Sequence, residues 1–161
     1  MEVHKIEKKG ENSKELDPVL VQPIGFVRND LGRRSYNQWK NTESDIIVLE
    51  KYQDALYRLD EFSHIEVFFY LHEMDREFKT RVHPTGNQKY PLMGAFATHT
   101  PNRPSKIAFT VCELLKVDDN VLRVKGLDAY DGSPVLDIKS FSGRFVESLR
   151  VPEWINDLRD G

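Results

Sequence analysis

Short segments in which apolar and polar residues alternate are the most regular feature of this chain, and they predict β-strands. In residues 63–74, Ile65, Val67, Phe69 and Leu71 fall on one face, because successive side chains of a strand point to opposite sides. The opposite face mixes aromatic with ionisable residues, which is typical of a pocket or a subunit interface. Further strands are expected at residues 19–27, 45–49, 93–98, 106–117, 121–125 and 135–139.

One segment repeats with a helical period instead. Tyr52, Ala55, Leu56 and Leu59 recur at the spacing i, i+3, i+4 and i+7, which predicts a helix that packs one apolar stripe on a sheet. Several short strands with tight turns and one or two short helices predict a mostly β protein, a small β-barrel with helical additions.

The pattern also suggests domain boundaries. Residues 1–17 are polar, with no period, and are expected to form a flexible N-terminal tail. Residues 18–148 are interpreted as the barrel domain and residues 149–161 as a short C-terminal helix. Two long polar stretches, residues 33–44 and 75–92, are expected as loops, and long loops in compact domains are often functional.

Composition narrows the class of protein. Hydrophobic residues make up 39% of the chain and charged residues 30%, as in globular proteins. No apolar run approaches the roughly 20 residues of a membrane helix, and residues 1–5 lack the core of a signal peptide, so we expect a cytoplasmic protein without membrane association. The single cysteine, Cys112, excludes an internal disulfide and is interpreted as a core residue. The histidines have no metal-ligand spacing, so no metal site is expected.

The net charge of −3 argues against a large nucleic-acid footprint, although it leaves room for a local basic patch. Candidate basic contacts lie in the two long loops, and their alternative interpretation is a solvated charged surface. These candidates are Arg33, Arg34, Lys40, Arg76, Lys79 and Arg81.

Two stretches contain most of the candidate chemistry. In residues 94–109, two prolines flank Asn102 and Arg103, which predicts a stiff loop. This loop could present the Arg103 guanidinium to a carboxylate or phosphate. The alternative interpretation is a rigid turn with a surface arginine.

In residues 126–139, Asp128 follows a predicted strand and could accept hydrogen bonds from a ribose or an amino group. Asp131 is interpreted as a turn residue, and Asp137 with Lys139 as an ion pair on one strand face.

Together these stretches resemble the signature of the TrmO (TsaA-like) family. Residues 94–110 resemble the family stretch that reads roughly Gly-x-Phe-Ala-Thr-Arg-Ser-Pro-x-Arg-Pro-Asn-Pro-Ile-Gly-Leu-Ser. Residues 127–139 keep the Leu-Asp and Asp-Gly-x-Pro-Val-x-Asp-Ile-Lys parts of the second family stretch. Residues 23–27 and 62–65 also match in place and order, so the resemblance covers residues 22–140.

This resemblance implies a small, usually dimeric β-barrel that binds S-adenosylmethionine near the subunit interface. It also implies methylation of N6 of threonylcarbamoyladenosine beside the tRNA anticodon, the activity of characterised bacterial members. A homodimer with tRNA as a possible partner is therefore expected, with Arg33, Arg34 and Arg103 as candidate substrate contacts. The implied cofactor-binding residues are Ser35, Tyr36, Asn37, His72, Glu73, His99, Phe109, Gly126, Leu127, Asp128, Ala129 and Tyr130.

The departures from the signature concern the first stretch. His99 stands where the family has arginine, Ser105 and Lys106 replace Asn-Pro, and residues 108–110 replace Gly-Leu-Ser. Histidine lacks the permanent charge and the bidentate donor of arginine. The methyl acceptor therefore stays open between tRNA, a smaller substrate and a non-catalytic S-adenosylmethionine-binding role, and no general base is assigned.

Overall fold

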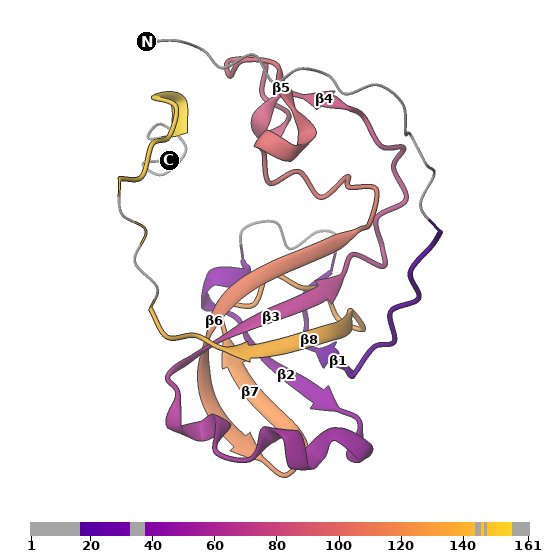
Figure 1. Cartoon of the computed structure of the whole chain (residues 1–161), viewed down its shortest axis with the longest axis vertical. Helices are drawn as coiled ribbons and strands as arrows, with labels where there is room; N and C mark the ends of the chain where they lie inside the picture. Colours follow the sequence, from indigo (N-terminus) through magenta and orange to yellow (C-terminus); the bar gives the residue numbers. More distant parts are fainter. Residues whose placement is uncertain (1–16, 33–37, 144–145, 147, 156–161) are drawn as a thin grey trace.

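The computed structural model describes residues 17–32, 38–143, 146 and 148–155. The described strands form a closed antiparallel barrel in the order β1-β2-β7-β6-β3-β8 (Figure 1). The prediction of a mostly β protein built on a small barrel is confirmed, and closure leaves no open sheet edge. The barrel strands are β1 (Gly25–Arg28), β2 (Glu43–Val48), β3 (His64–Tyr70), β6 (Ile107–Asp118), β7 (Val121–Lys125) and β8 (Pro134–Ser140).

Every barrel strand contributes alternate side chains to the core, which fills the inside of the barrel. Ile65, Val67 and Phe69 of β3 are at most 1% exposed, so the face predicted for this strand is confirmed. Leu71 is only partly buried, because β3 ends one residue before it. Cys112 is buried in the core as expected, and loss of solvent raises the pKa of its thiol to about 12.

The predicted amphipathic helix is helical, but as two 3-10 segments, η2 (Glu50–Leu56) and η3 (Leu59–Glu61). Arg58 lies between them with a φ of +63°, which breaks the continuous helix that the spacing predicted. Leu56 is buried and Tyr52 packs against the core, whereas Ala55 is exposed. The tighter 3-10 turn shifts the apolar stripe and turns Ala55 to solvent.

Two predicted strands are shorter than expected. Of residues 19–27 only the last three belong to β1, and Val19 and Leu20 are 85% and 87% exposed. Pro23 lacks the backbone N–H that pairing in a sheet requires. Of residues 93–98 only β5 (Met93–Gly94) is a strand, and the 3-10 helix η5 (Ala95–Ala97) follows it.

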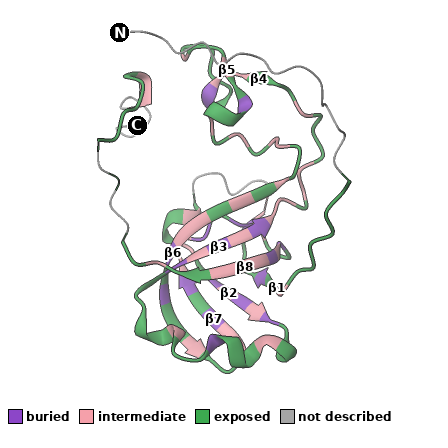
Figure 2. Ribbon diagram, viewed as in Figure 1, coloured by how far each residue is buried: buried purple, intermediate pink, exposed green. Residues whose placement is uncertain are grey.

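Residues 71–106, called the excursion below, leave the barrel after β3 and return to it at β6. They contain β4 (Arg81–Val82), which pairs with β5, and the short 3-10 helix η4 (Pro84–Gly86). The expected long excursion therefore has a small sheet of its own, which stands above the barrel in Figure 1. Its surface is largely exposed in Figure 2, and Pro84 and Ala95 are its buried residues.

Only short parts of the two chain ends belong to the described residues. Trp154 and Ile155 are helical, and the Trp154 ring lies 6.1 Å from that of Tyr90 in the excursion. Of the predicted C-terminal helix, residues 149–153 are not helical, and residues 156–161 lie outside the described residues, as does the predicted tail apart from residue 17. Within the described part of the chain, no helix has the length and apolar character needed to cross a bilayer.

Candidate functional site

The predicted site residues that the structure describes, apart from Phe109 on β6, come from loops at one end of the barrel. Because neighbouring strands are antiparallel, β1, β3 and β7 end where β2, β6 and β8 begin. The loop after β1, the excursion and residues 126–133 therefore gather at this loop end of the barrel (Figure 1). The opposite end holds η2, η3 and the hairpin turn between β6 and β7.

Residues 126–133, called the β7–β8 loop below, are fixed to β1 and to the turn that follows it. The backbone N–H of Asp131 donates to the Leu31 carbonyl at 2.9 Å, and that of Gly132 donates to the Val27 carbonyl at 2.8 Å. Val27 N–H in turn donates to the Ser133 carbonyl at 3.0 Å. The loop therefore has a defined position on the barrel.

Asn29 joins this loop to β2, a role that the sequence analysis missed. Its side-chain amide donates to the Ser44 hydroxyl at 2.8 Å and to the Ala129 carbonyl at 3.0 Å. Its backbone N–H donates to the Asp131 carboxylate at 3.0 Å, so Asp131 acts in the turn as predicted. The only sequence signal was the turn composition of residues 29–32, which does not reveal a partner 100 residues away.

Side chains of the β7–β8 loop alternate between the core and the outside. Leu127 is fully buried and Ala129 is 2% exposed, so only their backbone atoms could meet a ligand. Asp128 is exposed and Tyr130 half-buried. Gly126 has a φ of +82°, and its N–H donates to the Thr42 carbonyl at 3.1 Å, which joins the loop to the described end of the first long loop.

The carboxyl group of Asp128 in this loop is partly shielded from water. The residue as a whole is exposed, but nearby protein atoms displace part of the water around its carboxyl group, and this loss of solvent raises its pKa. A carboxylate that has already lost part of its hydration is well suited to accept hydrogen bonds from a ligand.

His72 lies beside the same loop. Its Nδ1 is 3.3 Å from the hydroxyl of Ser133, which is 2% exposed, and an added Cβ on Gly132 would lie 3.8 Å from its Nε2. Glu73 follows it in the chain. The structure thus brings together the predicted His72 and the predicted loop residues from positions that are 61 residues apart.

The other described candidates lie on β6 and in the excursion. Phe109 is 52% exposed on the outside of the barrel, where its ring is 5.0 Å from that of Phe68. His99 is exposed in the excursion, and the Arg103 guanidinium there donates to the carbonyl of Thr98 at 3.2 Å. The predicted Arg33, Arg34, Ser35, Tyr36 and Asn37 lie outside the described residues.

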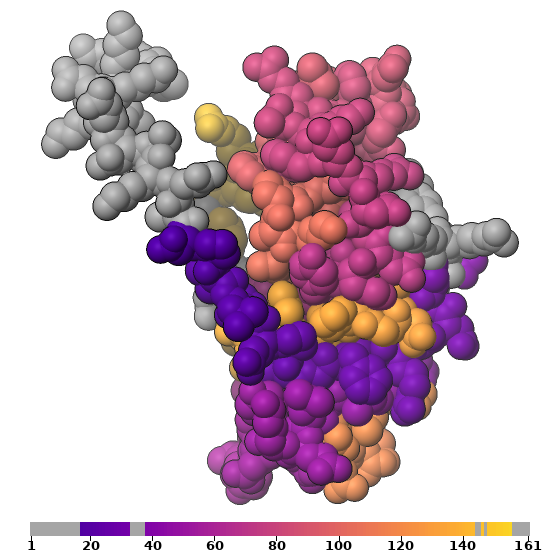
Figure 3. Space-filling model, turned by 90° about the vertical axis from the view of Figure 1, so that its right-hand side faces the viewer, coloured from indigo at the N-terminus to yellow at the C-terminus, as the bar shows by residue number. Residues whose placement is uncertain are grey.

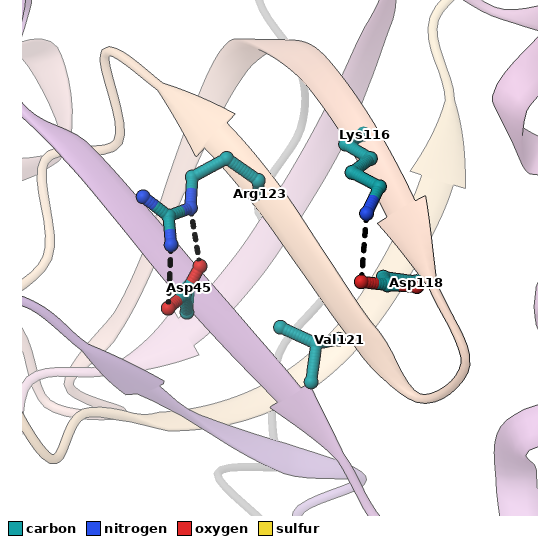
Figure 4. Close-up of a pocket in the computed structure, with 5 residues that line it drawn as sticks. All are labelled: Asp45, Lys116, Asp118, Val121 and Arg123. Atoms are coloured by element: carbon teal, nitrogen blue, oxygen red, sulfur yellow. Dashed lines mark hydrogen bonds and ion pairs between the residues drawn. The ribbon is translucent and has the colours of Figure 1, made fainter.

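Two surface hollows lie apart from these residues. The first, about 230 Å³, lies on the outside of β2, β6 and β7 and is lined by exposed ion pairs (Figure 4). There Arg123 donates to Asp45 at 2.5 and 3.1 Å, and these bonds raise the pKa of the guanidinium. The second hollow, about 440 Å³, borders η2. In the described part of the chain, no group of three histidine, cysteine or acidic residues is placed to hold a metal.

Comparison with known proteins supports the resemblance. Residues 29–145 match the model of the tRNA-methyltransferase O N-terminal domain. A probable S-adenosyl-L-methionine-binding protein of Methanothermobacter thermautotrophicus is 39% identical over 127 residues, which are 76% of this chain and 90% of that protein. A mouse tRNA (adenine(37)-N6)-methyltransferase is 36% identical over 90 residues, 55% of this chain and 21% of that enzyme.

The fold agrees with a solved relative. The crystal structure of TrmO from Pseudomonas aeruginosa superimposes with a TM-score of 0.67 at 27% identity, over 84% of this chain and 62% of that one. The chain thus spans less than two thirds of the length of this solved structure. With the family model covering most of its barrel, the chain belongs to the family of the tRNA-methyltransferase O N-terminal domain.

Proposed function

We propose that this protein is an S-adenosylmethionine-dependent methyltransferase that acts on N6 of an adenosine in tRNA. The observation that carries the proposal is the meeting of His72 with the β7–β8 loop, the stretch in which the family signature is intact. The names of the relatives, S-adenosyl-L-methionine-binding protein and tRNA methyltransferase, support the same cofactor and substrate class. As the finer assignment we propose threonylcarbamoyladenosine beside the anticodon, and a cytoplasmic location follows from that substrate.

The residues of the loop end fit the polar groups of such a cofactor. The Asp128 carboxylate can accept hydrogen bonds from hydroxyl or amino groups, and the Tyr130 ring can pack on a flat base. His72 presents one ring nitrogen while Ser133 holds the other. When bound, the cofactor supplies a methyl group already activated by the sulfonium, so the chain chiefly has to align the acceptor nitrogen.

The charge of the excursion supports an RNA substrate. The excursion, residues 71–106, contains six lysines and arginines and three acidic residues, in a chain whose net charge is −3. Such a local excess of positive charge attracts phosphates even on an acidic protein. The alternative, a smaller substrate or a non-catalytic binding role, rests on the altered residues 99 and 105–110.

The decisive experiment is a methylation assay. The protein and radiolabelled S-adenosylmethionine are incubated with tRNA from cells that lack this gene, and nuclease digestion identifies the modified nucleoside. We expect label in N6-methylated threonylcarbamoyladenosine. Label in another N6-methylated adenosine would refute only the finer assignment, and label in a nucleoside of another base would refute the proposed adenosine target. Cofactor binding without tRNA methylation would favour the alternative.

We expect S-adenosylmethionine, or its demethylated product, to stabilise the protein. A ligand that binds only the native state adds about 2.7 kcal/mol at a concentration one hundred times its dissociation constant. For a barrel of this size the melting temperature should rise by several degrees, measured by differential scanning fluorimetry. An unchanged melting temperature at saturating ligand would remove the basis of the proposed cofactor.

Replacing Asp128 with asparagine should weaken cofactor binding about tenfold or more, because a hydrogen bond to a charged group is worth about 1.5–3 kcal/mol. Since loss of solvent raises the pKa of this carboxyl group, its charge destabilises the folded state above its normal pKa. The variant should therefore melt at the parent's temperature or slightly higher without ligand. Isothermal titration calorimetry measures the affinity.

Asp131→Ala is the matched control for Asp128→Asn. Asp131 lies in the same loop but accepts the N–H of Asn29, so its loss should lower the melting temperature more than the cofactor affinity. Parent-like affinity of the Asp128 variant would show that this carboxylate is not a cofactor contact.

We also propose a homodimer. Phe109 and Ile107 are 52% and 40% exposed on the outside of β6, and the Phe109 ring packs against the ring of Phe68 on β3. Neighbouring exposed apolar side chains of this kind are typical of protein interfaces. Multi-angle light scattering should give about twice the chain mass of 18.8 kDa, and a monomeric mass at micromolar concentration would contradict the proposal.

A further inference from the structure

An exposed aromatic ring projects from the excursion. Phe96, in η5, keeps 74% of its surface accessible, although it is among the most apolar side chains. Its ring stacks on that of Phe78, with centroids 6.2 Å apart and 25° between the planes. The Arg103 guanidinium carbon lies 5.5 Å from the centre of the same ring. These three residues are called the Phe96 platform below.

Hydrogen bonds to the local backbone hold one member of the platform in place. The Arg103 guanidinium is tied to its own loop, because it donates to the carbonyls of Ala95 at 3.5 Å and Thr98 at 3.2 Å. The Ala95 carbonyl also accepts the N–H and the hydroxyl of Thr98, and Ala95 itself is 2% exposed. A ring that is presented from an ordered backbone loses less conformational freedom when a partner binds.

Positively charged residues lie on the segment that runs beside this ring. The sheet register places Arg81 opposite Gly94, and the Ala95 N–H donates to the Thr80 carbonyl at 2.9 Å, so residues 78–81 run beside η5. Lys79 and Arg81 on this segment are exposed. Figure 3 shows residues of the excursion, in magenta to pink, forming a protruding part of the molecular surface.

We propose that the Phe96 platform stacks an unpaired base of the RNA substrate while the neighbouring cations contact its phosphates. An exposed aromatic ring beside arginine and lysine side chains is the arrangement by which proteins bind single-stranded nucleic acid. An apolar protein partner would use the ring but would leave the surrounding positive charge unmatched. This inference rests on the proposed function, because it takes RNA as the substrate class, and it assigns Arg103 a supporting role in base stacking.

The test compares two variants of the full chain, Phe96→Leu and Phe96→Trp, for binding to a fluorescently labelled anticodon stem-loop by anisotropy. Leucine preserves apolar packing on Phe78 but offers no π face, so affinity should fall about tenfold or more. Tryptophan should bind at least as tightly as the parent. Because no charge changes, the slope of log affinity against log salt should stay the same in both variants.

A matched control is Tyr57→Leu, since Tyr57 is 81% exposed at the opposite end of the barrel and should leave RNA affinity unchanged. A 2-aminopurine in the loop of the RNA should lose fluorescence on binding to the parent and the tryptophan variant but not to the leucine variant. Parent-like RNA affinity of the leucine variant would overturn the platform and leave the proposed function intact. So would a change of the protein from dimer to monomer in this variant, because Phe96 would then belong to the subunit interface. Absence of RNA binding by the parent would overturn both.

Discussion

Replacing Gly25 with alanine should destabilise the barrel by about 3 kcal/mol or more, because overpacking against rigid neighbours is costly. Gly25 begins β1, where it pairs with Val48 of β2 and with Val135 of β8. A Cβ at this position would lie 2.3 Å from the Ile47 carbonyl oxygen and 3.0 Å from the Val48 Cα. Both are backbone atoms of a strand that is paired on its other side with β7, so relief would require the barrel itself to shift.

Urea denaturation followed by circular dichroism measures this loss. Gly94→Ala is the control, because Gly94 has a φ of −59° and an added Cβ there has no atom within 4 Å. The control should stay within about 0.5 kcal/mol of the parent. If the Gly25 variant were as stable as the control, β1 and β2 would not approach each other as the structure describes.

The close backbone contact at Gly25 could not be predicted from the sequence. The family resemblance included the glycine of Pro-Ile-Gly, but neither the residue type nor its local pattern shows that a backbone carbonyl 22 positions later lies against it. The close approach is a property of the closed barrel. A glycine of this kind becomes explicable only when the partner strand is known.

The parts of the fold that were predicted correctly depend on local order. The two-residue alternation through Ile65, Val67 and Phe69 identified β3 and its core face, because the period alone decides which side chains share a face. The apolar stripe of residues 52–59 identified a helical segment but not its 3-10 form. The break between the two 3-10 segments lies at Arg58, whose left-handed backbone no spacing rule indicates.

In the candidate site, too, local features were predictable and long-range contacts were not. Asp131 was correctly placed in a turn, since Asp-Gly is local turn chemistry. The links that assemble the loop end were not predictable, because Asn29 reaches Ala129 and His72 reaches Ser133 across long stretches of chain. The resemblance supplied Asp128 and His72 as candidates, and the structure added that they belong to the same end of the barrel.

The largest functional effect should come from the positive charge of the excursion. Changing Arg76, Lys79 and Arg81 together to glutamine should lower tRNA affinity about a hundredfold at 0.1 M salt. Each lost phosphate contact removes about 0.7–0.9 from the slope of log affinity against log salt, so the slope should become shallower by about 2. Filter binding across a salt series measures both quantities.

A second triple variant separates local contact from overall charge. Lys51, Arg58 and Lys116 are exposed near the end of the barrel opposite the loop end, and changing them to glutamine alters the net charge by the same amount. If the excursion contacts the phosphates, this variant should keep nearly all of the tRNA affinity, because charges more than a Debye length of about 10 Å away are screened at 0.1 M salt. Both variants should keep the parent's thermal shift with S-adenosylmethionine, since neither alters the β7–β8 loop. Equal loss of affinity in the two variants would show that the excursion is not the tRNA-binding surface.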